Sequence, residues 1–182
     1  RDKPVHYVAS LLGHEGPGSL FDVLKSRGLV ESLSAGMGTD TGHETSLELS
    51  LELTPRGLSQ EDDIIALAFD YIKLVREQGI APFRFEEDQQ LAELDFRFQE
   101  RPSPLHHVMR LSMQMARVAP EDVLQSPWMM ENYVPDEYRA ILDRLTPDNL
   151  LVTLQSPETL PEDAPRTTWY QTPYVLENNY QA

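Results

Sequence analysis

Two of the five histidines precede a glutamate, a pairing that zinc peptidases use to hold a metal ion and activate water. In the motif H-E-x-x-H, two imidazoles one helical turn apart bind zinc, and the glutamate acts on the water that the zinc carries. His14 would need a second histidine at position 18, which is glycine, and His43 would need one at position 47, which is leucine. The inverted motif H-x-x-E-H is absent as well. The sequence therefore contains neither zinc-peptidase motif.

Other residue types that carry catalysis offer no site either. Cysteine is absent, which excludes a disulfide framework, a thiolate nucleophile and a zinc site built on cysteines. The serine motif G-x-S-x-G does not occur, and the Gly-Pro-Gly of residues 16–18 has too few free N–H groups to hold a phosphate. His106 and His107 are adjacent, so on a helix their side chains diverge by about 100° and do not bind one ion unaided. We predict no catalytic and no metal-binding residue, with a metal site at these two histidines and nearby acidic residues as an open alternative.

The composition is that of a folded, strongly acidic domain. Its 182 residues include 30 Asp and Glu against 15 Lys and Arg, a formal net charge of -15. Because such a surface repels a phosphate backbone, nucleic acid is not expected as a partner. No apolar run approaches the length of a membrane span, so we expect a soluble chain with no membrane partner. The compartment is left unknown, because proteins without cysteine occur both inside and outside the cell.

Two helices followed by two strands are the first elements predicted along the chain, and they would position any functional site. Apolar residues recur at helical spacing over residues 5–12 and 20–24, with Ser19 or Gly18 as the cap of the second helix and Gly28 as its end. Residues 29–38 and 45–54 are predicted strands. In the second strand, leucines at positions 47, 49, 51 and 53 alternate with polar residues. This alternation is typical of an antiparallel sheet that is covered on one face only.

Helices are expected to cover the leucine face. Residues 64–75 carry a continuous apolar stripe that follows a capping box of Ser59 and Asp62 and ends at Gly79. Two further covering helices and two short helices are predicted to start at Pro82, Pro104, Pro120 and Pro135.

Two more strands are predicted near the carboxyl end. Residues 150–154 are apolar and β-branched, and residues 167–176 are rich in aromatic side chains, with Pro173 confining that strand to an edge or a bulge. The predicted fold class is therefore α+β, with a mostly antiparallel sheet covered on one face by helices.

Residues 13–20, Gly-His-Glu-Gly-Pro-Gly-Ser-Leu, carry a resemblance to a known family. This stretch resembles the second domain of the pitrilysin and insulin-degrading-enzyme family of zinc metallopeptidases. The similarity extends over nearly the whole chain, through residues 7–20, 24–29, 34–36, 97–102, 145–149 and 169–174. In that family, four homologous α/β domains form two halves that close around a peptide, and the first domain carries H-x-x-E-H. The second domain has lost the zinc ligands, which agrees with the missing motifs.

The resemblance implies a non-catalytic, structural and substrate-holding role within a zinc metalloendopeptidase. Such a domain helps to wall the peptide chamber and offers a strand edge that anchors the amino end of the substrate. Zinc is expected in the catalytic domain, and no cofactor in this segment. The implied partners are the catalytic and C-terminal domains of the parent chain and peptide substrates. The residues that match the anchoring edge are Gly13, His14, Ser34, Ala35, Gly36, Met37 and Gly38.

Residues 34–38 have the character that an anchoring edge needs. A peptide added to a sheet edge is held by main-chain hydrogen bonds, and small side chains let its backbone approach. The alternative is an ordinary edge strand with glycines at a bulge. Two departures from the family pattern, Ser10 in place of a histidine and Met37 with Gly38 in place of glycine and glutamine, imply a less polar site or different peptides.

We expect residues 1–182 to form a single domain taken from a longer polypeptide. The chain has no initiating methionine and starts after the place where the first strand of the family domain is expected. A sheet without that strand has an exposed edge, which we expect to recruit a second copy into a homo-oligomer. The alternative function is a free-standing peptide-binding or assembly module derived from a peptidase ancestor.

Overall fold

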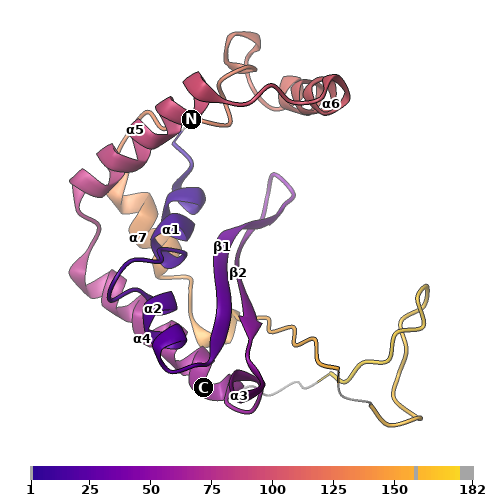
Figure 1. Ribbon diagram of the computed structural model, residues 1–182. Coiled ribbons are helices and arrows are strands. Elements are labelled where there is room, and N and C mark those ends of the chain that lie inside the picture. Colours follow the sequence, from indigo (N-terminus) through magenta and orange to yellow (C-terminus); the bar gives the residue numbers. More distant parts are fainter. Residues whose placement is uncertain (1, 158–159, 177–182) are drawn as a thin grey trace.

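The computed structural model describes residues 2–157 and 160–176 and has the expected α+β class. Helices dominate it, and the strands are confined to one hairpin (Figure 1). In chain order the elements are α1 (Pro4–Leu12), α2 (Leu20–Ser26), β1 (Val30–Asp40), β2 (Thr45–Leu53), α3 (Pro55–Leu58), α4 (Glu61–Gln78), α5 (Pro82–Phe98), α6 (Pro104–Met115), the 3-10 turn η1 (Pro120–Asp122), α7 (Pro135–Leu142) and the 3-10 turn η2 (Pro147–Asn149).

The sheet is an antiparallel hairpin in which β1 pairs with β2. Leu33 lies opposite Leu51 and Ala35 opposite Leu49, so both strands turn apolar side chains to the same face. The two strands expected here and the one-sided burial are confirmed. The sheet is antiparallel as expected but smaller than expected, since the described residues contain a sheet of these two strands alone.

The strands expected near the carboxyl end do not form. Residues 150–154 run as an extended segment without regular structure, and Leu151 is 86% exposed. Residues 167–176 contain a turn closed by a single bridge between Arg166 and Pro173. A strand is stable only where a neighbouring strand takes up its backbone hydrogen bonds, and within the described ranges these two segments have no such neighbour.

Two helices lie directly on the apolar face of the hairpin. Both α1 and α2 contact β1, and α4 packs against the outer side of α2 (Figure 1). Buried side chains of α2, β1 and α4, together with the residue just before β1, form one core, which consists of Leu20, Leu24, Leu29, Val30, Leu33, Ile64 and Ala68. The predicted long helix therefore completes the cover over the leucine face, while α1 and α2 supply its inner layer.

A second core is aromatic and joins α1 to α5 and α7. Tyr7 lies edge-on to Phe85, with ring centroids 5.7 Å apart and planes at 84°, and its centroid is 4.8 Å from that of Tyr138. Tyr133 contacts both Phe85 and Tyr138. Edge-to-face pairs of this kind add to the free energy gained by burial. Tyr7 and Val8 of α1 are fully buried in this core, and Tyr71 of α4 packs against both cores and so connects them.

Local signals at the helix ends are confirmed in two cases and wrong in one. The Ser19 hydroxyl accepts a hydrogen bond from the Asp22 N–H at 3.1 Å, as an N-cap does, and Gly28 ends the segment with φ of 69°. The capping box at Ser59 does not form. The Ser59 hydroxyl instead donates to the Arg56 carbonyl at 2.8 Å, because α3 ends there, and α4 starts after Gln60.

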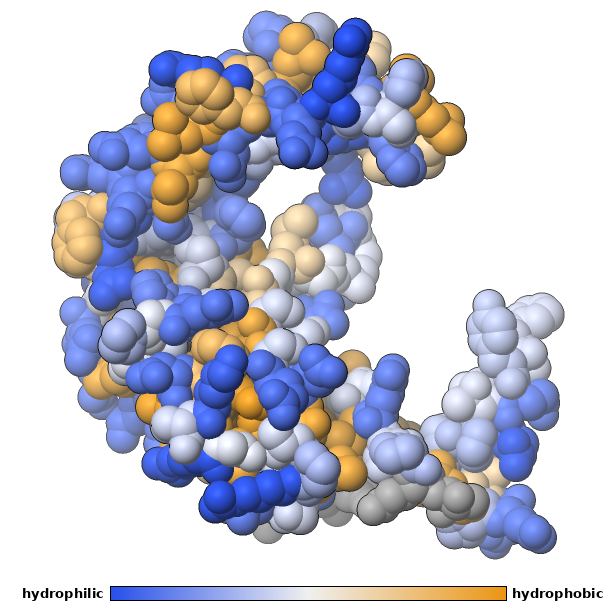
Figure 2. Space-filling model, in the orientation of Figure 1, coloured by the Kyte–Doolittle hydropathy of each residue, from blue (hydrophilic) through white to orange (hydrophobic). Residues whose placement is uncertain are grey.

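An arm made of α5, α6 and the turns that follow leads away from the two cores. The arm rises along one side of the molecule, and α6 lies beyond the end of α5 (Figure 1). Phe85 is the buried residue of α5, and α6 has none. The expectation that α6 covers the sheet is therefore wrong. Apolar side chains lie on the surface of the arm (Figure 2); they include Leu91, Leu94, Phe98, Leu105, Val108, Met109 and Met113.

Candidate functional site

Gly13 and Ala35 bring the end of α1 into contact with the middle of β1. A Cβ atom placed on Gly13 would lie 3.2 Å from the Ala35 nitrogen and 3.3 Å from the Ala35 Cβ. Only glycine lets the helix end approach the strand this closely without moving one of them. The Gly13 N–H closes the helix on the Ala9 carbonyl at 2.8 Å. Two of the residues selected from the sequence are thus adjacent in space.

His14 follows Gly13 but its side chain turns into its own loop. Its Nδ1 accepts a hydrogen bond from the Gly16 N–H at 2.7 Å, and the side chain is otherwise exposed. A Cβ on Gly16 would lie 2.3 Å from the ring, so a side chain there would displace the imidazole from this position. Because Nδ1 is an acceptor here, the proton of the neutral ring is on Nε2. The imidazole therefore presents an N–H donor to solvent beside the end of α1.

The stretch from Ser34 to Met37 lines a shallow hollow on the outer, solvent-exposed face of the hairpin. The hollow has a volume of about 190 Å³, and Glu48 and Ser50 of β2 line its other side. It lies beside Gly36, where an added Cβ would have no atom within 4 Å. At Gly38 the register with β2 becomes irregular, between Met37 and Asp40. Five of the seven residues selected from the sequence are thus consecutive in one strand.

One edge of β1 is open to a further strand. Its partner β2 takes up the backbone groups on one side. In the described part of the chain, no backbone hydrogen bond joins residues 30–38 to any segment other than β2. Alternate residues of β1 therefore direct N–H and C=O groups outward, which is the arrangement that accepts an added extended peptide.

The sequence prediction missed Glu48 and Ser50. Both belong to the polar residues that alternate with the leucines, so the pattern did predict that they lie on the solvent-exposed face of β2. Their position beside residues 34–37 depends on the register, in which Gly36 pairs with Glu48 and Ser34 with Ser50. The hairpin tip fixes that register, and no sequence signal near it specified the loop length.

The described residues bring no set of three metal ligands together. His106 and His107 lie on α6, where the Nδ1 of His107 is 3.4 Å from the guanidinium of Arg110. The alternative of a metal site at these histidines therefore has no third ligand within the described ranges. Among the same residues, no helix is long and apolar enough to cross a bilayer.

Comparison with known families divides the chain into two consecutive parts. Residues 1–91 match the family model described as the peptidase M16 inactive domain. Residues 96–181 match the model described as the middle or third domain of peptidase M16. The chain belongs to the peptidase M16 family, and it is a non-catalytic part of it, as the resemblance to the pitrilysin family predicted. The border between the two matches falls within α5.

Individual relatives agree with this assignment. The human (Homo sapiens) insulin-degrading enzyme is 32% identical over 177 residues, which are 97% of this chain and 17% of the enzyme. A nardilysin-like protein of Arabidopsis thaliana is 33% identical over 180 residues, or 97% of this chain and 18% of that protein. The chain thus spans about a sixth of the length of the curated relatives it matches.

A solved structure shows the same arrangement. The crystal structure of pitrilysin superimposes with a TM-score of 0.77 at 30% identity, over 81% of this chain and 16% of pitrilysin. The similarity therefore covers the fold as well as the sequence.

Proposed function

We propose that this chain is a structural and substrate-holding part of a pitrilysin-type zinc metalloendopeptidase, where it helps to wall the peptide chamber. Its membership of the M16 family and the match of residues 1–91 to an inactive domain support a non-catalytic role. In this proposal zinc is bound by another part of the parent polypeptide. In the same proposal this chain contributes binding and shape, and bond cleavage takes place elsewhere in the parent polypeptide.

The open edge of β1 is the observation that carries the substrate-holding role. Ser34, Ala35 and Gly36 have small side chains beside a hollow, on a strand whose second edge has no partner in the described residues. An extended peptide that adds to such an edge is held by main-chain hydrogen bonds, so peptides of many different sequences can bind there. Contact between Gly13 and Ala35 supports the strand from behind, so the edge is presented by packed elements.

Backbone-modified peptides test this proposal in the full chain. We expect an extended peptide to bind and to protect the β1 amides from hydrogen exchange. The same peptide with methyl groups on alternate backbone nitrogens should lose binding, because it lacks the donors that pair with β1. Methylation of the other set of nitrogens, which faces away from the strand, is the matched control. Protection confined to other elements, or equal binding by both methylated peptides, would refute the proposal.

The exposed arm supports a second, packing role. Leu105, Val108, Met109 and Met113 of α6 are all more than half exposed, and an apolar surface of this size is typical of a protein interface. We propose that other domains of the parent chain, including the catalytic and C-terminal domains, cover it. The alternative is a free-standing peptide-binding or assembly module, which would cover the same surface or the strand edge with a second copy. Light scattering distinguishes the two functions. If the parent chain forms a concentration-dependent dimer and Met109→Glu abolishes that dimer, the free-standing module is favoured.

A further inference from the structure

Glu48 places a carboxylate over the strand to which a peptide would be added. It pairs with Gly36 in the hairpin, and its Oε2 lies 3.1 Å from the position that a Cβ of Gly38 would occupy. Next to it, a Cβ on Gly36 would have no atom within 4 Å. We call the open space above Gly36 on the outer face the glycine gap; above Gly38, the Ser46 hydroxyl oxygen lies 2.6 Å from the position of an added Cβ. The Glu48 side chain borders this gap, since Glu48 and Gly36 line the same hollow.

The Glu48 carboxylate lies beside the gap. Its Oε1 accepts a hydrogen bond from the Ser50 hydroxyl at 3.4 Å, and its Oε2 lies 3.1 Å from the Cβ position of Gly38, where the Ser46 hydroxyl oxygen is closer, at 2.6 Å. Glu48 is exposed, and its neighbours on this face are serines and glutamates, with Glu52 further along the strand. A cation that enters the gap would therefore meet a carboxylate and no opposing positive charge on this face of β2.

We propose that Glu48 selects a lysine or arginine side chain in the extended peptide bound at β1. This inference rests on the proposed substrate-holding function and adds the chemical class of the substrate. Neighbouring strands lie about 4.8 Å apart, so a peptide beside β1 has its backbone about 10 Å from β2. A lysine opposite Gly36 spans that distance with its flexible four-carbon stem and brings its ammonium group to the carboxylate. Any side chain at position 36 would block this path.

Glu52 provides the matched control on the same strand and face. It pairs with Ser32 rather than with a glycine, and its Oε2 accepts a hydrogen bond from the Ser32 hydroxyl at 3.2 Å. Position 32 therefore carries a side chain next to the carboxylate, whereas position 36 has none. Loss of the Glu52 charge therefore changes the net charge by the same amount as loss of the Glu48 charge, without touching the glycine gap.

The test compares two peptides against two variants of the full chain. The peptides are a nine-residue chain of alternating threonine and valine with lysine at its centre, and the same chain with norleucine there. We expect the wild type to prefer the lysine peptide about two- to fivefold at low salt, as exposed ion pairs do. Glu48→Gln should abolish the preference and leave the affinity for the norleucine peptide unchanged. Glu52→Gln should keep the preference.

The outcomes separate this inference from the function on which it rests. If both peptides bind at β1 with equal affinity, or if Glu52→Gln removes the preference as completely as Glu48→Gln, the role of Glu48 is overturned and the anchoring edge stands. If neither peptide protects the β1 amides, both the anchoring edge and the role of Glu48 are overturned. A preference that persists in Glu48→Gln also overturns the inference.

Discussion

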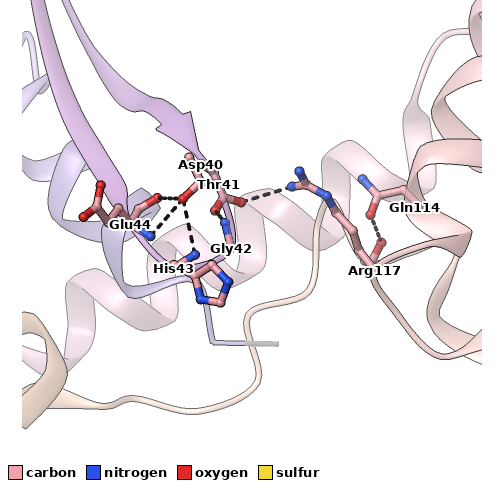
Figure 3. Close-up of polar contacts among 8 residues, drawn as sticks. Asp40, Thr41, Gly42, His43, Glu44, Gln114 and Arg117 are labelled. Atoms are coloured by element: carbon pink, nitrogen blue, oxygen red, sulfur yellow. Dashed lines mark hydrogen bonds and ion pairs between the residues drawn. The ribbon is translucent and has the colours of Figure 1, made fainter.

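Arg117 and Asp40 join the tip of the hairpin to the far end of the arm. The Arg117 Nη1 donates to the Asp40 Oδ2 at 3.0 Å, although 77 residues separate them in the sequence (Figure 3). Asp40 is held in place by the tip itself, since its Oδ1 accepts from the Gly42 N–H at 2.9 Å. Arg117 belongs to the part that matches the middle domain and Asp40 to the part that matches the inactive domain. The ion pair thus connects two family domains, and Figure 2 shows an opening between the arm and the hairpin that this contact bounds.

Neutralising either partner of this ion pair should loosen the arm without unfolding the protein. The Arg117 side chain is 62% exposed, and exposed ion pairs contribute at most about 1 kcal/mol. We expect Asp40→Asn and Arg117→Gln to lower the free energy of unfolding by less than about 1 kcal/mol. The distance between spin labels on the hairpin tip and on α6 should become longer and broader in both variants. Reversing both charges, with Asp40→Arg and Arg117→Asp together, should restore the original distance.

A local ion pair serves as the control for this measurement. Asp136 and Arg139 are 3.2 Å apart within α7, so Asp136→Asn removes a comparable charge without affecting the arm. Its label distances should match those of the wild type. Unchanged distances in Asp40→Asn and Arg117→Gln would show that the arm is held by other contacts.

Much of the hairpin and its cover was predictable because the signals are local. The leucine alternation over 47–53 fixed a strand and its buried face, and Ser19 and Gly28 marked the ends of α2 by their own side chain and backbone preferences. The hairpin and the ends of α2 depend on neighbouring residues, and the structure has them where the sequence placed them. The stretch 34–38 was selected through its small residues and the family resemblance, and its anchoring role stays a prediction.

The missed features depend on what lies opposite in space. Residues 150–154 have a strong strand preference, yet Leu151 stays exposed because no strand lies beside it in the described residues. The stripe of α6 predicted a buried face in the same way, and in the structure none of its residues is buried. Glu48 was passed over because its relation to Gly36 exists only once the register is set. Long-range pairing is the step that local patterns do not determine.

Two glycines should respond to alanine in opposite ways. A Cβ on Gly57 would lie 1.9 Å from the carbonyl oxygen of Leu29, and the glycine is buried where α3 meets the start of β1. Backbone atoms cannot yield to this overlap without moving the strand, so we expect Gly57→Ala to cost about 2 to 4 kcal/mol. Gly36→Ala places its methyl group in open space and should leave stability unchanged or raise it by up to about 1 kcal/mol.

Urea unfolding of both variants checks this contrast. Gly36→Ala also narrows the glycine gap. This variant should therefore prefer the lysine peptide less than the wild type does, while its urea midpoint should not fall. Equal midpoints for Gly57→Ala and the wild type would mean that α3 and Leu29 are further apart than the structure places them.

Replacing Gly13 should disturb the candidate edge from behind. A Cβ at this position would press on the Ala35 nitrogen at 3.2 Å, and a valine would add two further methyl groups to that contact. We expect Gly13→Val to lower the free energy of unfolding by about 1 to 3 kcal/mol and to weaken peptide binding at β1. Hydrogen exchange at the Ala35 amide reports the shift directly. Gly36→Ala is the control for stability, since it adds a methyl group to β1 without a close contact, whereas Gly18→Val is not suitable because φ there is 80°.

Tyr7 should make the protein sensitive to alkaline pH. Its side chain is fully buried, and its hydroxyl has no hydrogen-bond partner among the described residues. Burial, reinforced by the negative charge of Asp88, raises the pKa of Tyr7 above its ordinary value. The folded state therefore keeps the proton at pH values where the unfolded chain has lost it. The contribution of Tyr7 to stability is complete below about pH 10 and is lost as the pH rises from there toward the folded-state pKa.

Tyr7→Phe tests this account in two ways. Removing a buried hydroxyl that has no partner should raise the free energy of unfolding by about 1 kcal/mol at pH 7. It should also reduce the fall in stability above pH 10, because one group that loses its proton on unfolding is gone. The fall that remains includes the contribution of Tyr138, because burial raises the pKa of Tyr138 as well. Urea unfolding at pH 7 and at steps from pH 9 to 11 measures both effects. Tyr170, which is 89% exposed, supplies the control, and Tyr170→Phe should follow the wild-type curve. A Tyr7→Phe variant that is less stable at pH 7 would mean that the hydroxyl has a bound partner.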